Sequence, residues 1–129
     1  MKSTKKAPKV RTFECTYVFE ATKKPVPGRE CAVIQVQAES LFRGHHLYVD
    51  RAYARHFLIH HFILGGRKIW PPDETPRPAT ELRKLGPPIV RFPTASTGQY
   101  LTLKVENTTP EPRRFRALLA GVGLKGGRA

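Results

Sequence analysis

Histidine is the residue type in this sequence best suited to metal chemistry. The 129 residues contain five, namely His45, His46, His56, His60 and His61. A catalytic metal site needs two or three such ligands, usually with a carboxylate, converging from neighbouring strands. His45 and His46 are adjacent, so on a strand they point to opposite faces. His56 and His60 would share a face of a strand or a helix, but Asp50 is the only nearby acid before the Pro-rich segment that follows. The spacing of the histidines therefore matches no metal-site pattern.

The sequence also lacks the local patterns that are typical of nucleophilic catalysis and of phosphate binding. Cys15 and Cys31 fall on predicted strands, not at a helix N-terminus where a thiolate would be stabilised. They are interpreted as core thiols, with a disulfide between them left open. Gly65-Gly66-Arg67-Lys68 lacks the P-loop spacing, and the Gly-rich 121–127 segment has no following helix. We therefore expect no catalytic residues, no metal and no cofactor, and the chain is not expected to be an enzyme.

The charge balance predicts a polyanionic partner. Lys and Arg number 23 against 10 Asp and Glu, a formal net charge of +13. Such a surface attracts nucleic acid or an anionic membrane face. Arginines beside Phe115 and Trp70 suit phosphate contact with base stacking. However, Phe115 also falls on a predicted core face, and a solvated strand face explains the same arginines. The candidate contact residues are Lys2, Lys5, Lys6, Lys9, Arg11, Arg67, Lys68, Arg113, Arg114 and Arg116.

Length and composition favour one domain built of short elements. The chain has 12 Pro and 10 Gly, which interrupt helices and argue against a long-helix bundle. No apolar run approaches the roughly 18 residues of a transmembrane helix. The basic N-terminus has no apolar core behind it, so it does not match a secretory signal. We expect a flexible basic arm over 1–11, a domain over 12–121 and a loose basic tail over 122–129.

Alternation of apolar and polar residues predicts strands along most of the domain. The first, 12–20, has Phe13, Cys15, Tyr17 and Phe19 on one face, and we expect the second to pair with it in an antiparallel hairpin. Loops or turns are predicted at 23–29, 43–44 and 107–112 from their Pro, Gly and polar content. The predicted strands are 12–20, 31–39, 46–49, 57–64, 67–70, 89–92, 100–106 and 114–119.

Two regions admit a helix as well as a strand. Over 50–64, Asp50 could cap a helix and Gly65 end it, but 57–64 is rich in β-branched and aromatic residues. We favour a helical turn at 50–55 followed by a strand. Over 110–120, Pro110 suits the first turn of a helix, but the alternation at 114–119 favours a strand.

Residues 71–88 form a long Pro-rich excursion, with one helical turn possible at 81–85. A loop of this length in a compact domain is usually functional or part of an interface. The candidate interface residues in and beside it are Trp70, Pro71, Pro72, Pro76 and Pro78. Together these seven or eight short strands predict an all-β fold, either an antiparallel β-sandwich that is jelly-roll-like or a small barrel.

The stretch from Arg91-Phe-Pro-Thr-Ala-Ser-Thr-Gly-Gln-Tyr-Leu-Thr-Leu-Lys-Val-Glu-Asn-Thr-Thr to Phe115-Arg-Ala-Leu-Leu-Ala-Gly121 resembles single-jelly-roll structural proteins of bacterial viruses. Ala38-Glu-Ser-Leu-Phe-Arg-Gly44 and 57–65 fit the same pattern, so the resemblance covers about residues 31–121. It rests on turn and core positions. It implies a capsid or decoration subunit without catalytic residues.

The leading hypothesis is therefore a non-enzymatic shell subunit, located in the virion, or in the cytoplasm if the protein is not viral. Its expected partners are copies of itself and other virion proteins, and contact of the basic arm with nucleic acid is left open. No membrane span is expected. The main alternative is a small basic nucleic-acid-binding β-barrel. A cupin-like metal-binding protein that uses the histidines is the third.

Overall fold

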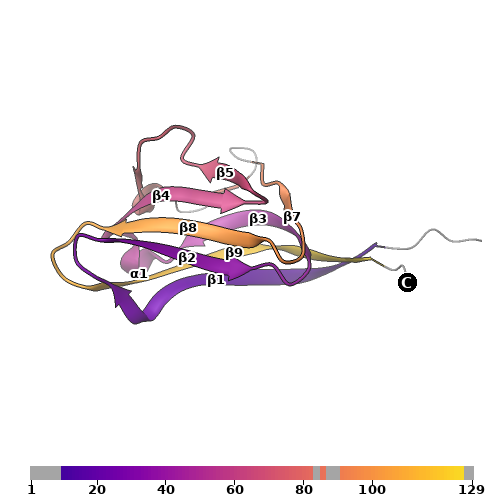
Figure 1. Ribbon diagram of the computed structural model, residues 1–129, viewed down its shortest axis with the longest axis horizontal. Coiled ribbons are helices and arrows are strands. Elements are labelled where there is room, and N and C mark those ends of the chain that lie inside the picture. The colour runs from indigo at the N-terminus through magenta and orange to yellow at the C-terminus, as the bar shows by residue number, and fades with distance from the viewer. Residues whose placement is uncertain (1–9, 83–84, 87–90, 127–129) are drawn as a thin grey trace, which may run out of the picture.

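The fold is a sandwich of two antiparallel β-sheets. The structure is a computed structural model and describes residues 10–82, 85–86 and 91–126. Figure 1 shows the strands running side by side in two layers. The strands are β1 (Val10–Val26), β2 (Cys31–Gln37), β3 (Leu41–Val49), β4 (Phe57–Leu64), β5 (Arg67–Trp70), β6 (Arg77–Pro78), β7 (Thr94–Ala95), β8 (Tyr100–Asn107) and β9 (Arg113–Gly126). Helical structure in these residues consists of α1 (Arg51–Ala54) and a 3₁₀ turn, η1 (Ala79–Glu81).

The strand order defines a jelly roll. One sheet has the order β1-β9-β3-β7 and the other β2-β8-β4-β5, with β6 also paired to β4. The pairs β1–β9, β2–β8, β3–β7 and β4–β5 are all antiparallel and nested one inside the next along the chain. This is the arrangement of one long hairpin rolled into a sandwich. The predicted all-β sandwich is confirmed.

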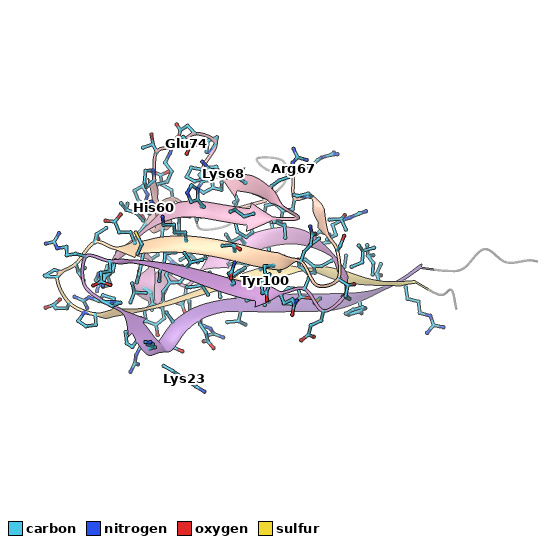
Figure 2. The ribbon with its side chains drawn as sticks, in the orientation of Figure 1. Lys23, His60, Arg67, Lys68, Glu74 and Tyr100 are labelled. Carbon is cyan, nitrogen blue, oxygen red and sulfur yellow. The ribbon has the colours of Figure 1, made fainter. Side chains whose placement is uncertain are left out.

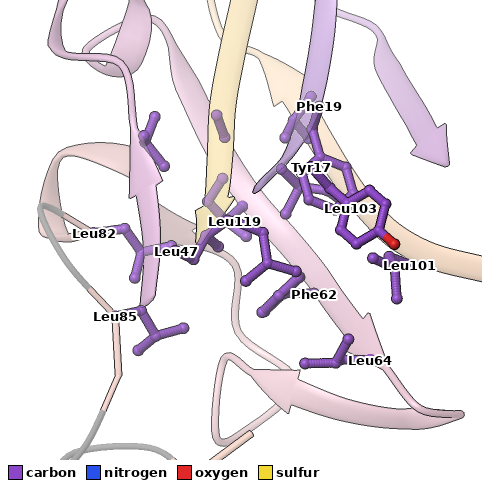
Figure 3. Close-up of a cluster of buried hydrophobic side chains, with 14 of the residues drawn as sticks. Tyr17, Phe19, Leu47, Phe62, Leu64, Leu82, Leu85, Leu101, Leu103 and Leu119 are labelled. Carbon is purple, nitrogen blue, oxygen red and sulfur yellow. The ribbon is translucent and has the colours of Figure 1, made fainter. Parts of the chain in front are cut away.

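Alternation of side chains along the strands builds the core between the sheets. The strand positions that the sequence predicted to face inward on β8 and β9 are buried: Leu101, Leu103, Val105, Phe115, Ala117 and Leu119. From β1, Tyr17 and Phe19 enter the same cluster, and Figure 3 shows them beside Leu101 and Leu103. Aromatic rings from opposite sheets also pack edge to face, as Phe57 and Phe115 do with ring centroids 4.9 Å apart. Such pairs hold the two layers together.

The predicted hairpin between the first two strands is wrong. The second strand, β2, pairs with β8, in the sheet opposite β1. The chain crosses between the layers at 27–30, where Gly28 packs so closely on Pro110 that a Cβ would lie 2.2 Å from its carbonyl oxygen. Crossing lets the apolar inner face of β2 cover that of β1. Strand β1 is also longer than predicted and continues through 23–26, beyond an irregularity between Ala21 and Val26.

Gly44 and the glycines within 121–126 also lie in strands. The turn predicted at 43–44 and the first part of the loose tail predicted over 122–129 are therefore wrong. Strand β3 continues through Gly44, and Phe92 packs on this glycine so closely that a Cβ would lie 2.8 Å from the ring. Strand β9 continues to Gly126 and pairs with β1 along its whole length. Phe13 of β1 covers Gly123, where a side chain would collide with its ring. Close packing, which no local pattern predicts, therefore selects glycine here.

The remaining predictions of secondary structure are partly confirmed and partly wrong. The helical turn after Asp50 and the hairpin of β4 and β5 around Gly65–Gly66 are confirmed. The helical alternative for 110–120 is wrong. The helical turn in the Pro-rich segment is η1, two residues before the predicted 81–85, and 83–84 lie outside the described residues. Of the predicted strand over 89–92, residues 89–90 lie outside the described residues and 91–92 are not in a strand; the strand that follows them is β7 at Thr94–Ala95.

Asn107 clamps the end of the sandwich where the chain turns twice. Its side chain is fully buried. The amide nitrogen donates to the carbonyl oxygens of Val26, at 3.0 Å, and Glu111, at 2.7 Å. The amide oxygen accepts from the backbone nitrogen and the hydroxyl of Thr109. One side chain thus holds the β1–β2 crossing and the β8–β9 turn together.

We predict that Asn107→Ala lowers the free energy of unfolding by about 2–3 kcal/mol, because buried backbone groups lose their partners. Urea unfolding followed by circular dichroism measures this change. Gln35→Ala, on the exposed face of β2, is the control and should change stability by less than about 0.5 kcal/mol. Equal effects of the two substitutions would contradict the clamp.

Candidate functional site

The predicted polyanion-contact residues do not form one surface. Lys2, Lys5, Lys6 and Lys9 lie outside the described residues, and Arg11 is exposed on β1. Arg67 and Lys68 begin β5, beyond the end of β4 that is farthest from Asn107. Arg113, Arg114 and Arg116 begin β9, just after the turn that follows Asn107. The two groups therefore lie at opposite ends of the strands and on different sheets.

The Arg67–Lys68 group is partly neutralised. Lys68 Nζ donates to the carbonyl oxygen of Asp73 at 2.8 Å and to a carboxylate oxygen of Glu74 at 3.2 Å. Figure 2 shows Lys68 and Glu74 on the same side of the molecule, with Arg67 nearer the turn. This pairing folds the segment after β5 back onto the strand, which is a structural use of the Lys68 charge.

The second group joins an arginine that the sequence analysis missed. Arg55, Arg113 and Arg114 line an open hollow with His56 and Tyr53, between the end of α1 and the start of β9. We call it the arginine hollow; its other lining residues are Ala52 and Pro112. Arg55 is the C-cap residue of α1, and only the packing of α1 against β9 brings it beside Arg113.

Local hydrogen bonds fix the walls of this hollow. Asp50 caps α1 by accepting from the backbone nitrogen of Ala52 at 3.0 Å, and its own backbone nitrogen donates to Arg116. The carbonyl oxygen of His56 accepts from Thr108. Because both ends of the segment are tied to neighbouring elements, the cationic side chains start from fixed backbone positions.

The hollow carries an excess of positive charge. Burial, followed by the charges of Arg113 and Arg55, lowers the pKa of His56. Glu111 opposes this effect and also accepts a hydrogen bond from Arg113 at 2.8 Å. A hollow lined by guanidinium groups and one phenol ring suits a phosphate with a stacked planar group. Tyr53 is the aromatic lining residue of the hollow and is partly buried against the core, whereas Phe115 is fully buried and cannot stack on a base.

The predicted interface residues divide between core and surface. Pro71 is buried, and Trp70 is partly buried and packed against the core. Its indole nitrogen is buried without a hydrogen-bond partner in the described part of the chain. Pro72 and Pro78 are exposed and Pro76 is partly exposed, so these three present surface that a neighbour can reach.

The outer face of the β1-β9-β3 layer carries an apolar stripe. Every second residue of the second half of β9 lies on this side and is partly exposed, and we call Leu118, Ala120, Val122 and Leu124 the outer stripe. Tyr48 and Leu41 of β3 lie opposite its two ends and are 36% and 40% exposed. Beside Val122, Glu14 of β1 and Arg43 of β3 stand on opposite sides.

The histidines group differently from their sequence spacing. His56 lies in the arginine hollow and His60 on the outer face of β4, so the two do not share a site. His60 instead meets Glu106 of β8 and Cys31 of β2. Cys31 is exposed and free, which corrects its interpretation as a core thiol, and Cys15 is also free in the other sheet. Neither grouping follows from residue spacing, because strand register decides which residues become neighbours.

Comparisons with known proteins add no relative. No protein-family model matches the chain, and neither the curated proteins nor the solved structures contain a match to it. Within the described ranges, no helix has the length and apolar character needed to cross a membrane. The class of protein is therefore defined by the fold, a jelly-roll β-sandwich, and by its surface features.

We predict that Arg55→Gln raises the pKa of His56, because removing a nearby positive charge makes imidazolium easier to form. The shift is measured by NMR titration of the imidazole proton signals. Arg67→Gln removes the same charge at the other end of the sandwich and should leave the pKa of His56 unchanged. An unchanged pKa in Arg55→Gln would contradict the electrostatic link.

Proposed function

We propose that the protein is a non-enzymatic structural subunit that assembles with copies of itself into a protein shell, such as a virion capsid or decoration layer. The observation that carries this proposal is the outer stripe on β9. It lies at the centre of a rigid sheet face and is bordered by Tyr48 and Leu41. Scattered exposed apolar residues are ordinary, but a contiguous patch marks a contact surface.

The pattern of charge beside the stripe favours a second copy of the chain as the partner. Glu14, Val122 and Arg43 form one row across three strands, with the acid on one side and the base on the other. A two-fold axis along β9, between two stacked faces, places Glu14 of each copy over Arg43 of the other. The same operation stacks the outer stripes. A self-complementary patch of this kind is what an isologous interface requires.

Other features are consistent with a subunit role. Sheets that close by nested pairing are stiff, and stiff subunits lose little entropy on assembly. The exposed Pro72 and Pro78 lie on the excursion after β5, where a neighbour can dock. The jelly roll itself is shared by capsid proteins, lectins and cupins, so the fold alone does not assign this function.

We predict that Val122→Glu shifts the protein towards monomer and weakens self-association by at least ~100-fold, because a carboxylate would be desolvated in the contact. Size exclusion with light scattering on nuclease-treated protein, over a range of concentrations, measures the effect. The variant should keep its unfolding midpoint, because Val122 is partly exposed on the outer face of the sheet and lies outside the buried core.

The matched control is Ile63→Glu, which places the same charge on an Ile at the outer face of the other sheet. Ile63 is half-buried between Lys68 and Thr102, its strand neighbours. The control should assemble as the original chain does. If the original chain remains monomeric at all concentrations, alone and with nucleic acid, the shell proposal fails.

A second candidate function, nucleic-acid binding, is favoured by the arginine hollow. Arg55, Arg113 and Arg114 converge there beside Tyr53. Phosphate contact by guanidinium groups with stacking on a tyrosine ring is typical of proteins that bind single strands. This contact is compatible with the shell proposal, since a shell subunit can hold packaged nucleic acid.

We predict that the double variant Arg55→Gln/Arg114→Gln binds a single-stranded oligonucleotide about tenfold more weakly. Its plot of log affinity against log salt should also flatten by roughly 1.4, the value expected for two lost phosphate contacts. Fluorescence anisotropy at several salt concentrations measures both quantities. Arg67→Gln/Lys104→Gln removes the same total charge elsewhere, and an equal loss in that control would mean that no local site exists.

A further inference from the structure

We propose that Cys31, His60 and Glu106 form a zinc site on the outer face of the second sheet. The three side chains come from three adjacent strands, β2, β4 and β8. Their ligand atoms all lie within 4.8 Å of one another. The site is separate from the outer stripe and the arginine hollow, and it does not depend on the shell proposal.

Strand register brings the three residues together. Cys31 and Glu106 are directly opposite in the β2–β8 ladder, so their side chains leave the sheet on the same face. On β4, the register shifts between Ile59 and His61. Ile59 and Phe62 both remain buried, so this bulge leaves both His60 and His61 outside the core. Bulges of this kind commonly re-aim side chains beside functional sites.

The distances between the ligand atoms are close to those found around a coordinated zinc ion. His60 Nε2 lies 2.7 Å from Glu106 Oε1 and 4.0 Å from Cys31 Sγ. In a tetrahedral zinc site, with bonds of about 2.0–2.3 Å, neighbouring ligand atoms are about 3.3–3.6 Å apart. The two measured distances lie on either side of this range. Small side-chain rotations would therefore bring all three atoms to bonding distance, without movement of the strands.

The donor types select zinc. A thiolate, an imidazole and a carboxylate are all established zinc ligands. Magnesium and calcium prefer oxygen ligands throughout, so the sulfur of Cys31 excludes them as the favoured ion. Lys104, a cationic side chain two residues from Glu106 on β8, pairs with His61 of β4 beside the site.

The arrangement leaves room for a fourth ligand. Cys31 is exposed, and the His60 and Glu106 side chains are 21% and 32% exposed. Water or a group from another molecule can therefore complete the tetrahedron. A bound ion would also join β2, at the sheet edge, to β4 across the intervening β8. Binding to the folded state alone would raise the unfolding temperature as the zinc concentration increases.

The test uses the full chain, kept reduced with a phosphine that does not bind zinc strongly. Zinc binding is measured by isothermal titration, and cobalt(II) is then substituted as a spectroscopic probe. We expect one zinc per chain. We also expect a sulfur-to-cobalt charge-transfer band in the near ultraviolet, which reports a thiolate ligand directly.

The variants separate this site from other thiols and histidines. Cys31→Ser should abolish the charge-transfer band, and His60→Asn and Glu106→Gln should each weaken zinc binding by about tenfold or more. Cys15→Ser and His56→Asn are the matched controls and should bind as the original chain does. All five should unfold cooperatively, because their side chains lie outside the fully buried core.

Two results would overturn the proposal. One is the absence of zinc binding by the original chain at micromolar zinc. The other is binding that Cys15→Ser or His56→Asn removes while Cys31→Ser retains it. Either result would leave the shell proposal unaffected, because that proposal is tested by solution mass and not by metal content.

Discussion

The pairing of β1 with β9 is the constraint on which the rest of the structure depends. It joins residue 10 to residue 126 and continues through Ala21 and Phe115, so both ends of the domain lie in one ladder. Everything between them must then fold back within that pair, which yields the nested pairs β2–β8, β3–β7 and β4–β5. Contacts distant in the sequence therefore dominate, and Asn107 secures the end where two of the turns meet.

The same nesting creates each surface to which we assign a role. The outer stripe lies in the middle of a sheet face because β9 has β1 on one side and β3 on the other. The arginine hollow exists because α1 packs on the start of β9. The cluster of Cys31, His60 and Glu106 forms because β8 lies between β2 and β4. The roles differ in chemistry, but all three arise from contacts between elements that are remote in sequence.

The positive charge of the chain affects the outer stripe and the arginine hollow differently. A net charge of +13 opposes the approach of two copies. The outer stripe itself is uncharged, and the row through Val122 pairs one acid with one base. Three arginines, Arg55, Arg113 and Arg114, instead line the hollow near α1, where burial and the charges of two of them lower the pKa of His56. Assembly and polyanion contact can therefore use separate parts of the same molecule.

The sequence by itself determined the all-β class, most strand positions and the inward faces of β8 and β9, because a two-residue alternation is a local pattern. It also predicted the capped turn at Asp50 and the hairpin at Gly65–Gly66. It did not determine the partners of strands that are distant in the sequence, so the predicted β1–β2 hairpin was wrong. Gly44 and Gly123 were mistaken for turn and tail because close packing that selects glycine leaves no local pattern. Only the tertiary structure placed Arg55 with Arg113 and His60 with Cys31, since neighbours across a sheet are decided by register and not by spacing along the chain.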